Sequence, residues 1–272
     1  MIEGGSRTAL LVAAYRGRAS ARGQVCSDPW AADLAGEAGL EYARMHDAVF
    51  PHGELWIAVR TATLDGYVRS LVRSGMQQVV ILGAGLDTRA QRLASPGVRF
   101  FEVDHPETQA LKLRRLGELD YPLEVATYVG CDFEQDDFVE RLADEGLDLH
   151  APAAIVWEGV VPYLTRAAVE ATLSRVAEGL HPESVLHFDL VNQRLVQGDV
   201  QEGLSDLVEG LGEPFRFGCS DPVPMVHAAG FRHIRTISFD EACLSLTGTY
   251  DRARTFRFQL IAVVSRERCL DP

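Results

Sequence analysis

The sequence predicts an α/β protein built on one mostly parallel sheet, and three observations lead to this class. Short apolar, β-rich runs alternate with amphipathic segments through the middle of the chain. Helices of this length between strands imply right-handed βαβ units, which make neighbouring strands parallel. A G-x-G turn, Gly83-Ala84-Gly85, follows the first apolar run. Because such sheets bind ligands beyond the carboxyl ends of their strands, this turn marks the expected site.

The N-terminal 75 residues are expected to form a helical cap. Residues 6–22 read as a basic helix, and Asp28-Pro29 breaks the chain before a second helical stretch. Over 54–74 the apolar residues fall near helical spacing, and Gly75 supplies a stop.

The central segment, 76–191, carries the alternating pattern and is expected to bind the ligand. We expect strands at 78–82, 98–103, 124–130, 153–158 and 184–190, and helices at 88–94, 106–118, 136–145 and 166–180. Thr88 and Gln91 match a capping box, which predicts that the first of these helices begins at Thr88.

The rest of the chain predicts an insertion and a C-terminal unit. A polar insertion at 192–220 has an apolar helical face followed by two phenylalanines (Leu204, Leu207, Val208, Leu211, Phe215, Phe217). With Tyr15, Arg16 and Arg18 it forms either a lid over a substrate pocket or a helix packed on the sheet edge. Over 221–272 we expect a helix at 221–229 and a β-hairpin of strands 231–238 and 255–265, joined by a loop of about sixteen residues. The last strand is expected to be antiparallel, at the end of a seven-stranded sheet.

Composition sets limits on function. The 272 residues are 47% hydrophobic and 24% charged, which suits one large globular domain. With 39 acidic and 26 basic residues the net charge is −13, which argues against a nucleic-acid or anionic-membrane partner. The cysteines and histidines are scattered, without C-x-x-C or H-E-x-x-H spacing. We therefore expect that the protein has no metal site and that its thiols are reduced. The apolar run from Thr8 to Ala14 is too short to span a membrane, so we expect a soluble cytoplasmic protein, with a homodimer as one option.

The sequence of the turn itself limits the class of ligand that can bind. A dinucleotide fingerprint would place a third small residue at position 88, where this chain has Thr. Binding a nucleoside without phosphates does not require a small residue at this position. Asp104 ends the second strand, twenty-one positions after Gly83, and is placed to accept both ribose hydroxyls. That feature is common to NAD and S-adenosyl sites, and an exposed strand-end acid is the plainer alternative.

Three segments together carry a family resemblance: VVILGAGLDTRAQRL, FEVDHPETQALKLRRL and IVWEGVVPYL. With these in order, the chain resembles the leucine carboxyl methyltransferase family of S-adenosylmethionine-dependent enzymes. That family includes enzymes that modify protein C-termini and bacterial O-methyltransferases of polyketide pathways. The likeness runs from SRTALLVAAYRGRAS to about Ala177 and implies a Rossmann-like class I methyltransferase fold that binds S-adenosyl-L-methionine.

The resemblance also implies roles for individual residues. Arg60 would grip the methionine carboxylate, and Gly83 and Gly85 would pass beneath the amino-acid moiety. Asp104 would bind the ribose, and Glu158 would lie near the methionine end. Asp132 would accept the adenine amino group, with Phe133 near the ring, and Arg18 loosely matches a basic residue over the carboxylate.

Each role has a plainer alternative. Arg60 could be a helix-surface charge, and Asp132 could cap the following helix. Glu158 follows a segment of apolar residues that is expected to be buried. Burying a carboxylate there without a binding partner would cost free energy. Tyr163 is a substrate contact or a core aromatic. No catalytic set is visible, so the catalytic candidates are Tyr15, Arg18 and Tyr163.

The predicted function is O-methylation of a small natural-product acceptor by S-adenosylmethionine. A carboxyl acceptor giving a methyl ester is favoured, because it is ionised at neutral pH and needs no base. The alternatives are a phenol or hydroxyl acceptor, a protein C-terminal carboxyl group, a nicotinamide-dependent oxidoreductase, or a methyltransferase-like fold that binds the cofactor without transferring methyl.

Overall fold

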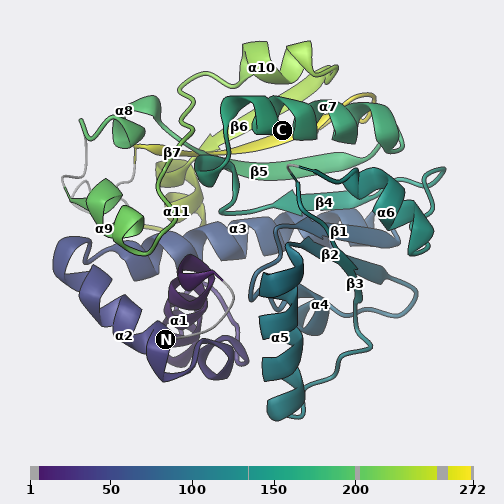
Figure 1. The fold of residues 1–272 in the computed structure, drawn as a ribbon. Coiled ribbons are helices and arrows are strands. Elements are labelled where there is room, and N and C mark those ends of the chain that lie inside the picture. The colour runs from purple at the N-terminus through teal and green to yellow at the C-terminus, as the bar shows by residue number, and fades with distance from the viewer. Residues whose placement is uncertain (1–5, 134, 200–202, 250–256, 271–272) are drawn as a thin grey trace.

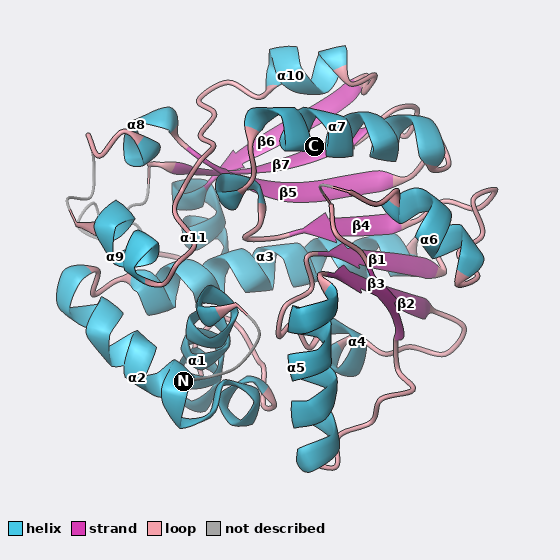
Figure 2. Ribbon diagram, in the orientation of Figure 1, coloured by secondary structure: helices cyan, strands magenta, loops and turns pink. Residues whose placement is uncertain are grey.

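The computed structural model describes residues 6–133, 135–199, 203–249 and 257–270. One seven-stranded sheet in the order β3-β2-β1-β4-β5-β7-β6 runs through the molecule, with helices on both faces (Figures 1 and 2). The predicted α/β class is therefore confirmed.

The strands match the predicted positions closely. They are β1 (Gln78–Leu82), β2 (Arg99–Asp104), β3 (Thr127–Gly130), β4 (Ala154–Trp157), β5 (Val185–Val191), β6 (His233–Ser238) and β7 (Gln259–Ser265). The pairs among β1 to β5 are parallel, and β7 pairs antiparallel with both β5 and β6. The carboxyl ends of β1, β2, β3 and β4 consequently share one edge of the sheet.

The last strand is antiparallel as predicted, but its place in the sheet differs from the prediction. It lies between β5 and β6 rather than at the edge. The run from Ile261 to Val264 is buried throughout, as in a strand covered on both faces, whereas much of β6 is partly or fully exposed. The apolar run therefore takes the inner position and β6 becomes the edge strand.

Helices cover both faces of the sheet. On one face α6 (Phe138–Asp144), α7 (Arg166–Gly179) and α10 (Val223–Ala228) enclose the largest core cluster. On the other, α3 (Gly53–Arg73) and α4 (Arg89–Arg92) pack on β1, β4 and β7 through a second cluster. The helix α5 (Pro106–Glu118) joins β2 to β3.

A helix lies where a loop was predicted between the last two strands. The helix α11 (Phe239–Thr247) follows β6 directly. Ser238 caps it through a complete capping box with Glu241, and Gly248 ends it in the left-handed conformation. The S-x-x-E spacing was present in the sequence, so this helix was predictable. The first part of the expected strand 255–265 lies outside the described residues.

The N-terminal region is helical, as predicted. The helix α1 (Arg7–Ala21) begins at its cap Ser6, and α2 (Ala31–Val49) packs closely along it. At Gly17 an added Cβ would stand 2.7 Å from the Cβ of Ala32, so the contact depends on this glycine. No helix in the described residues is long and apolar enough to cross a lipid bilayer.

The insertion contains two short helices followed by an extended segment. The helices are α8 (Gln193–Val196) and α9 (Leu204–Gly210), and we name residues 211–219 the strap. Leu211 packs among α1, α2 and α3, while the N–H groups of Arg216 and Phe217 donate to the carbonyl of Pro162 at 2.7 and 3.1 Å. Pro162 belongs to the short 3-10 helix η1 (Val161–Tyr163) after β4. The strap therefore connects the N-terminal helices to the carboxyl end of β4.

Candidate functional site

A cavity of about 350 Å³ lies at the carboxyl ends of the first four strands, beside the start of α1. The residues predicted to bind the cofactor all line it: Arg60, Gly83, Gly85, Asp104, Asp132, Phe133 and Glu158. Of the three catalytic candidates, the cavity includes Tyr163 but neither Tyr15 nor Arg18. Arg60 and Glu158, which lie 98 positions apart in the chain, thus border one space.

The glycine turn forms the floor of this cavity. Gly83 and Gly85 have φ values of +65° and +49°, which favour glycine. A Cβ at Gly83 would stand 2.3 Å from Cγ2 of Val160. The N–H groups of Gly83 and Ala84 donate to the carbonyl of Val103, at 2.8 and 3.1 Å, and tie the turn to β2. The turn leaves bare backbone facing the cavity, where a ligand can approach closely.

Asp104 lies at the end of β2 and is held against the turn. Its carboxylate accepts hydrogen bonds from the N–H of Gly85 and, at 2.7 Å, from the N–H of His105. Burial raises the pKa of this carboxyl group, and the two backbone donors oppose that effect. The residue is therefore a positioned, partly buried acceptor and not the exposed strand-end acid of the plainer alternative.

Asp132 and Phe133 border the cavity beyond β3. The side chain of Gln135 donates to the Asp132 carboxylate at 2.6 Å. The alternative that Asp132 caps the next helix is wrong, because Asp137 caps α6 by accepting from the N–H groups of its first turn. The ring of Phe133 packs 5.8 Å from that of Phe138.

Arg60 is buried, so the surface-charge alternative is wrong. Its side chain is 4% exposed, and its guanidinium lies 5.5 Å from the centre of the Trp56 ring. Its Nε donates to Glu158 at 2.8 Å and its Nη1 to Asp189 at 3.2 Å. Burial opposes the charged form, but Asp189 and Glu158 outweigh it and raise the pKa of Arg60. The arginine stays cationic at the cavity wall.

Asp189 is a functional candidate that the sequence reasoning missed. It lies near the end of β5, is fully buried, and does not border the cavity. One carboxylate oxygen accepts from the N–H of Gly159 at 2.6 Å, and the other from Arg60 and, at 2.9 Å, from the Gln259 amide. It therefore holds the arginine and the turn after β4 in a fixed relation. An acid in a buried strand was the available signal.

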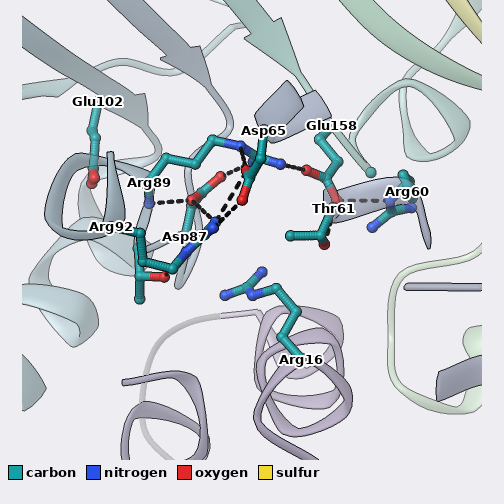
Figure 3. A network of polar contacts seen from close by, with 12 residues as sticks. Arg16, Arg60, Thr61, Asp65, Asp87, Arg89, Arg92, Glu102 and Glu158 are labelled. Atoms are coloured by element: carbon teal, nitrogen blue, oxygen red, sulfur yellow. Dashed lines mark hydrogen bonds and ion pairs between the residues drawn. The ribbon is translucent and has the colours of Figure 1, made fainter. Parts of the chain in front are cut away.

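Behind the glycine turn lies a network of buried ion pairs (Figure 3). Arg89 pairs with Asp87, with Asp65 of α3 at 2.8 Å, and with Glu158 at 2.5 Å. Arg92 also pairs with Asp65. Because Glu158 also pairs with Arg60, the network runs from the turn to the cavity wall. Desolvation raises the pKa of the Glu158 carboxyl, but Arg89 and Arg60 together lower it below the ordinary value.

This network overturns the capping box predicted at Thr88 and Gln91. The Thr88 side chain makes no cap bond, and its hydroxyl instead accepts from Nε of Arg92 at 2.8 Å. The Asp87 carboxylate accepts from the N–H of Arg89 at 2.7 Å and so takes the capping role. The helix α4 is only four residues long.

The basic residue at the cavity is Arg16 and not Arg18, which corrects the prediction. Arg16 pairs with buried Asp28 at 2.9 Å and donates to the carbonyl of Leu86 at 2.5 Å. Arg18 instead pairs with Asp47 and Glu54, at 2.7 and 2.9 Å, beside a separate polar cavity. Two positions on a helix differ by about 200°, so the two arginines face opposite sides of α1.

Tyr15 also lies away from the cavity. Its ring is buried among the N-terminal helices, where a Cβ on Gly53 would stand 3.0 Å from it. Burial raises the pKa of its hydroxyl, and the charge of Asp47 adds to that effect. Tyr15 is a core aromatic in this structure.

The cavity also has polar groups that the sequence reasoning did not identify. Ser6 and Thr8, at the start of α1, donate their hydroxyls to Glu213 of the strap, Ser6 at 3.0 Å. All three border the cavity near Tyr163, whose ring lies 5.5 Å from that of Phe215. More than 200 positions separate Glu213 from the two hydroxyls, and no sequence motif links them. Within the described ranges, no group of three or more His, Cys, Asp or Glu is arranged to hold a metal ion.

Comparisons with known proteins agree with this geometry. The sequence profile of the leucine carboxyl methyltransferase family matches residues 9–177. A candidate S-adenosyl-L-methionine-dependent methyltransferase of Mycobacterium avium (strain 104) is 34% identical over 204 residues, which cover 71% of this chain and 68% of that protein.

Solved structures share the fold. A DUF574 family protein from Streptomyces avermitilis superposes with a TM-score of 0.66 at 15% identity, over 97% of this chain and 98% of its own. A candidate methyltransferase from Thermobifida fusca gives 0.65 at 16% identity, over 95% and 94%. The matched residues 9–177 contain most of α1, the glycine turn, Asp104 and Glu158. The chain therefore belongs to the leucine carboxyl methyltransferase family of S-adenosylmethionine-dependent methyltransferases.

Proposed function

We propose that the protein transfers the methyl group of S-adenosylmethionine to an oxygen of a small acceptor. The observation that carries the proposal is the convergence of seven residues, chosen from the sequence for cofactor binding, on one cavity of about 350 Å³. The cofactor fits this donor set. The backbone of Gly83 and Gly85 borders the cavity, and acids stand at the ends of β2 and β4.

Each part of the cavity has a binding task in this proposal. Asp104 would accept the ribose hydroxyls and Asp132 the adenine amino group. Arg60 and Arg16 supply the positive charge that a methionine carboxylate requires. When bound, the cofactor supplies an activated methyl carbon, so the residues mainly align the reacting groups. Such alignment is worth about 7–11 kcal/mol when the geometry is good.

The acceptor is proposed to be a small natural-product-type molecule. The strap and the start of α1 border the cavity, and a concave pocket of this volume suits a small molecule better than a protein C-terminus. The reacting group is a carboxylate, which the sequence reasoning favours, or a hydroxyl, which needs a base. The acidic Glu213 at the cavity favours the hydroxyl. The nicotinamide alternative loses support, because Thr88 is buried and occupies the position where a small residue is needed.

Titration calorimetry with the wild-type protein tests the cofactor class. S-adenosylhomocysteine is expected to bind with micromolar or tighter affinity, and NAD to give no measurable heat. Binding of NAD in preference to S-adenosylhomocysteine would overturn the proposal.

The role of Arg60 is tested by Arg60→Lys. Removing the charge altogether would leave the buried Asp189 without its ion-pair partner and Glu158 with Arg89 alone, which costs about 3–5 kcal/mol and endangers the fold. Lysine keeps the charge but loses the planar fork. We expect S-adenosylhomocysteine to bind at least about tenfold more weakly, and 5′-methylthioadenosine, which lacks the carboxylate, to bind as before. Arg69→Lys, at an exposed position of α3, is the control. Equal weakening of both ligands would contradict a contact with the carboxylate.

A further inference from the structure

A carboxylate from the strap borders the cavity, and the residue roles proposed above for cofactor binding do not include it. Glu213 accepts the hydroxyls of Ser6 and Thr8, and both donate to the same oxygen, Oε2. Among the residues that the structure describes, no hydrogen bond or ion pair involves its Oε1. Glu213 borders the cavity, so a bound molecule can reach a hydrogen-bond acceptor there.

Glu213 lies on the side of the cavity that the start of α1 and the 3-10 helix η1 form, because the strap bonds to Pro162 of η1 and Glu213 itself to Ser6 and Thr8. Burial raises the pKa of the Tyr163 hydroxyl, the charge of Glu213 raises it further, and Arg60 opposes them. Tyr163, Glu213 and Arg60 all border the same cavity. Asp104 and Asp132, which are assigned to the nucleoside, come from the ends of β2 and β3 instead. The carboxylate of Glu213 is thus associated with the methionine end.

The strap holds Glu213 in place from both sides. Leu211, two residues before it, is buried against the N-terminal helices. Three residues after it, the N–H of Arg216 donates to Pro162 at 2.7 Å. The hydroxyls of Ser6 and Thr8 then fix the side chain itself. A carboxylate with this support can be aimed at a substrate atom.

We propose that Glu213 is a catalytic residue that binds the acceptor, and that the acceptor presents a hydroxyl group. This inference rests on the proposed methyl transfer. A carboxylate acceptor at hydrogen-bond distance from Glu213 would meet a like charge, whereas a hydroxyl donates a hydrogen bond to Oε1. As the acceptor oxygen forms its bond to the methyl carbon, the bond from that carbon to the sulfonium sulfur breaks. The hydroxyl proton passes to Glu213, which later releases it to water, and a neutral thioether remains.

Matched aromatic pairs test this assignment, because each pair differs only in the reacting group. The probes are phenol with benzoate and 2-naphthol with 2-naphthoate. Their binding to the protein loaded with S-adenosylhomocysteine is measured by saturation-transfer NMR, and methyl transfer is measured with labelled S-adenosylmethionine. We expect the hydroxyl member to bind better and to be methylated. Preference for the carboxylates, or no preference in either pair, would overturn the proposal.

Glu213→Gln separates catalysis from binding. We expect a fall in kcat of about 100-fold with 2-naphthol, with unchanged affinity for S-adenosylhomocysteine and little change in KM. Glu209→Gln, which alters an exposed acid on α9, should behave as wild type. An unchanged kcat in the Glu213 variant would overturn its role. If the wild-type protein fails to bind S-adenosylhomocysteine, the proposed function itself falls; if it binds but prefers carboxylates, only this inference falls.

Discussion

At the scale of single residues, the cavity depends on charges that are buried and paired. Arg60 is held by Glu158 and Asp189, and Glu158 is held in turn by Arg89. Buried pairs of this kind add little net stability, but removing one partner leaves an uncompensated charge. We infer that they fix the orientation of Arg60 more than they stabilise the fold. Conservative substitutions are therefore the informative ones here.

His187 of β5 gives the protein a predicted sensitivity to acid. It is buried, its ring stacks on Tyr67 at 4.8 Å, and burial lowers its pKa from 6.5 to about 4. Between these values the unfolded chain binds a proton that the folded protein does not. The stability that the protein has while His187 is neutral is fully present above pH 6.5. It is lost as the pH falls toward 4, because proton binding then favours the unfolded chain.

His187→Phe should remove this contribution while preserving the stacked ring. When the pH is lowered from 7 to 4.5, the free energy of unfolding of wild type should fall by about 2–3 kcal/mol more than that of the variant. Urea unfolding of both proteins at the two pH values measures this. A constant difference between them would show that His187 does not titrate as its burial predicts.

At the scale of elements, the turn after β1 is the part most constrained by local geometry. Gly83 combines a φ of +65° with a contact that leaves no room for a Cβ. The turn could be predicted because G-x-G directly after an apolar run is typical of a tight turn at the end of a strand. The start of α4 at Thr88 was predicted to within one residue, but its capping was not, because Thr88 accepts a hydrogen bond from Arg92, whose position depends on Asp65 and Asp87 being buried together.

Gly83→Ala should lower the free energy of unfolding by about 2 kcal/mol or more, since it adds backbone strain and a clash with Val160. It should also weaken S-adenosylhomocysteine binding. Gly66→Ala is the matched control on α3, where the added methyl group meets nothing within 4 Å. That change should be neutral or stabilise by about 0.5–1 kcal/mol. Thermal unfolding and calorimetry on both variants provide the measurement, and equal stability of the two would contradict the constraint at Gly83.

Other elements show where periodicity succeeds and where it fails. The strands from β1 to β5 and the helices α1, α3, α5 and α7 follow from apolar spacing alone. The position of β7 inside the sheet does not follow from spacing, because strand order depends on which strand has apolar residues that must be buried on both faces of the sheet. The arginine at the cavity was placed two residues away, at Arg18, since a short basic segment gives no sign of which face of α1 meets the turn.

At the scale of the whole molecule, one cavity collects side chains from most of the chain. The helix α1 supplies Arg16 and Thr8, α3 supplies Arg60, and the turn and strand ends supply the residues matched by motif. The strap adds Glu213 from the other side. The motif residues could be predicted because each follows a recognisable strand. Glu213 could not, because its role exists only once the strap is folded beside α1, and for Asp189 the only signal in the sequence was an acid in a buried strand.

A crystal structure of the protein with S-adenosylhomocysteine tests this account most directly. We predict that the ribose hydroxyls bind Asp104, that the amino-acid moiety crosses the backbone from Gly83 to Gly85, and that its carboxylate faces Arg60 and Arg16. A ligand bound elsewhere, with Gly83 and Asp104 untouched, would contradict the account.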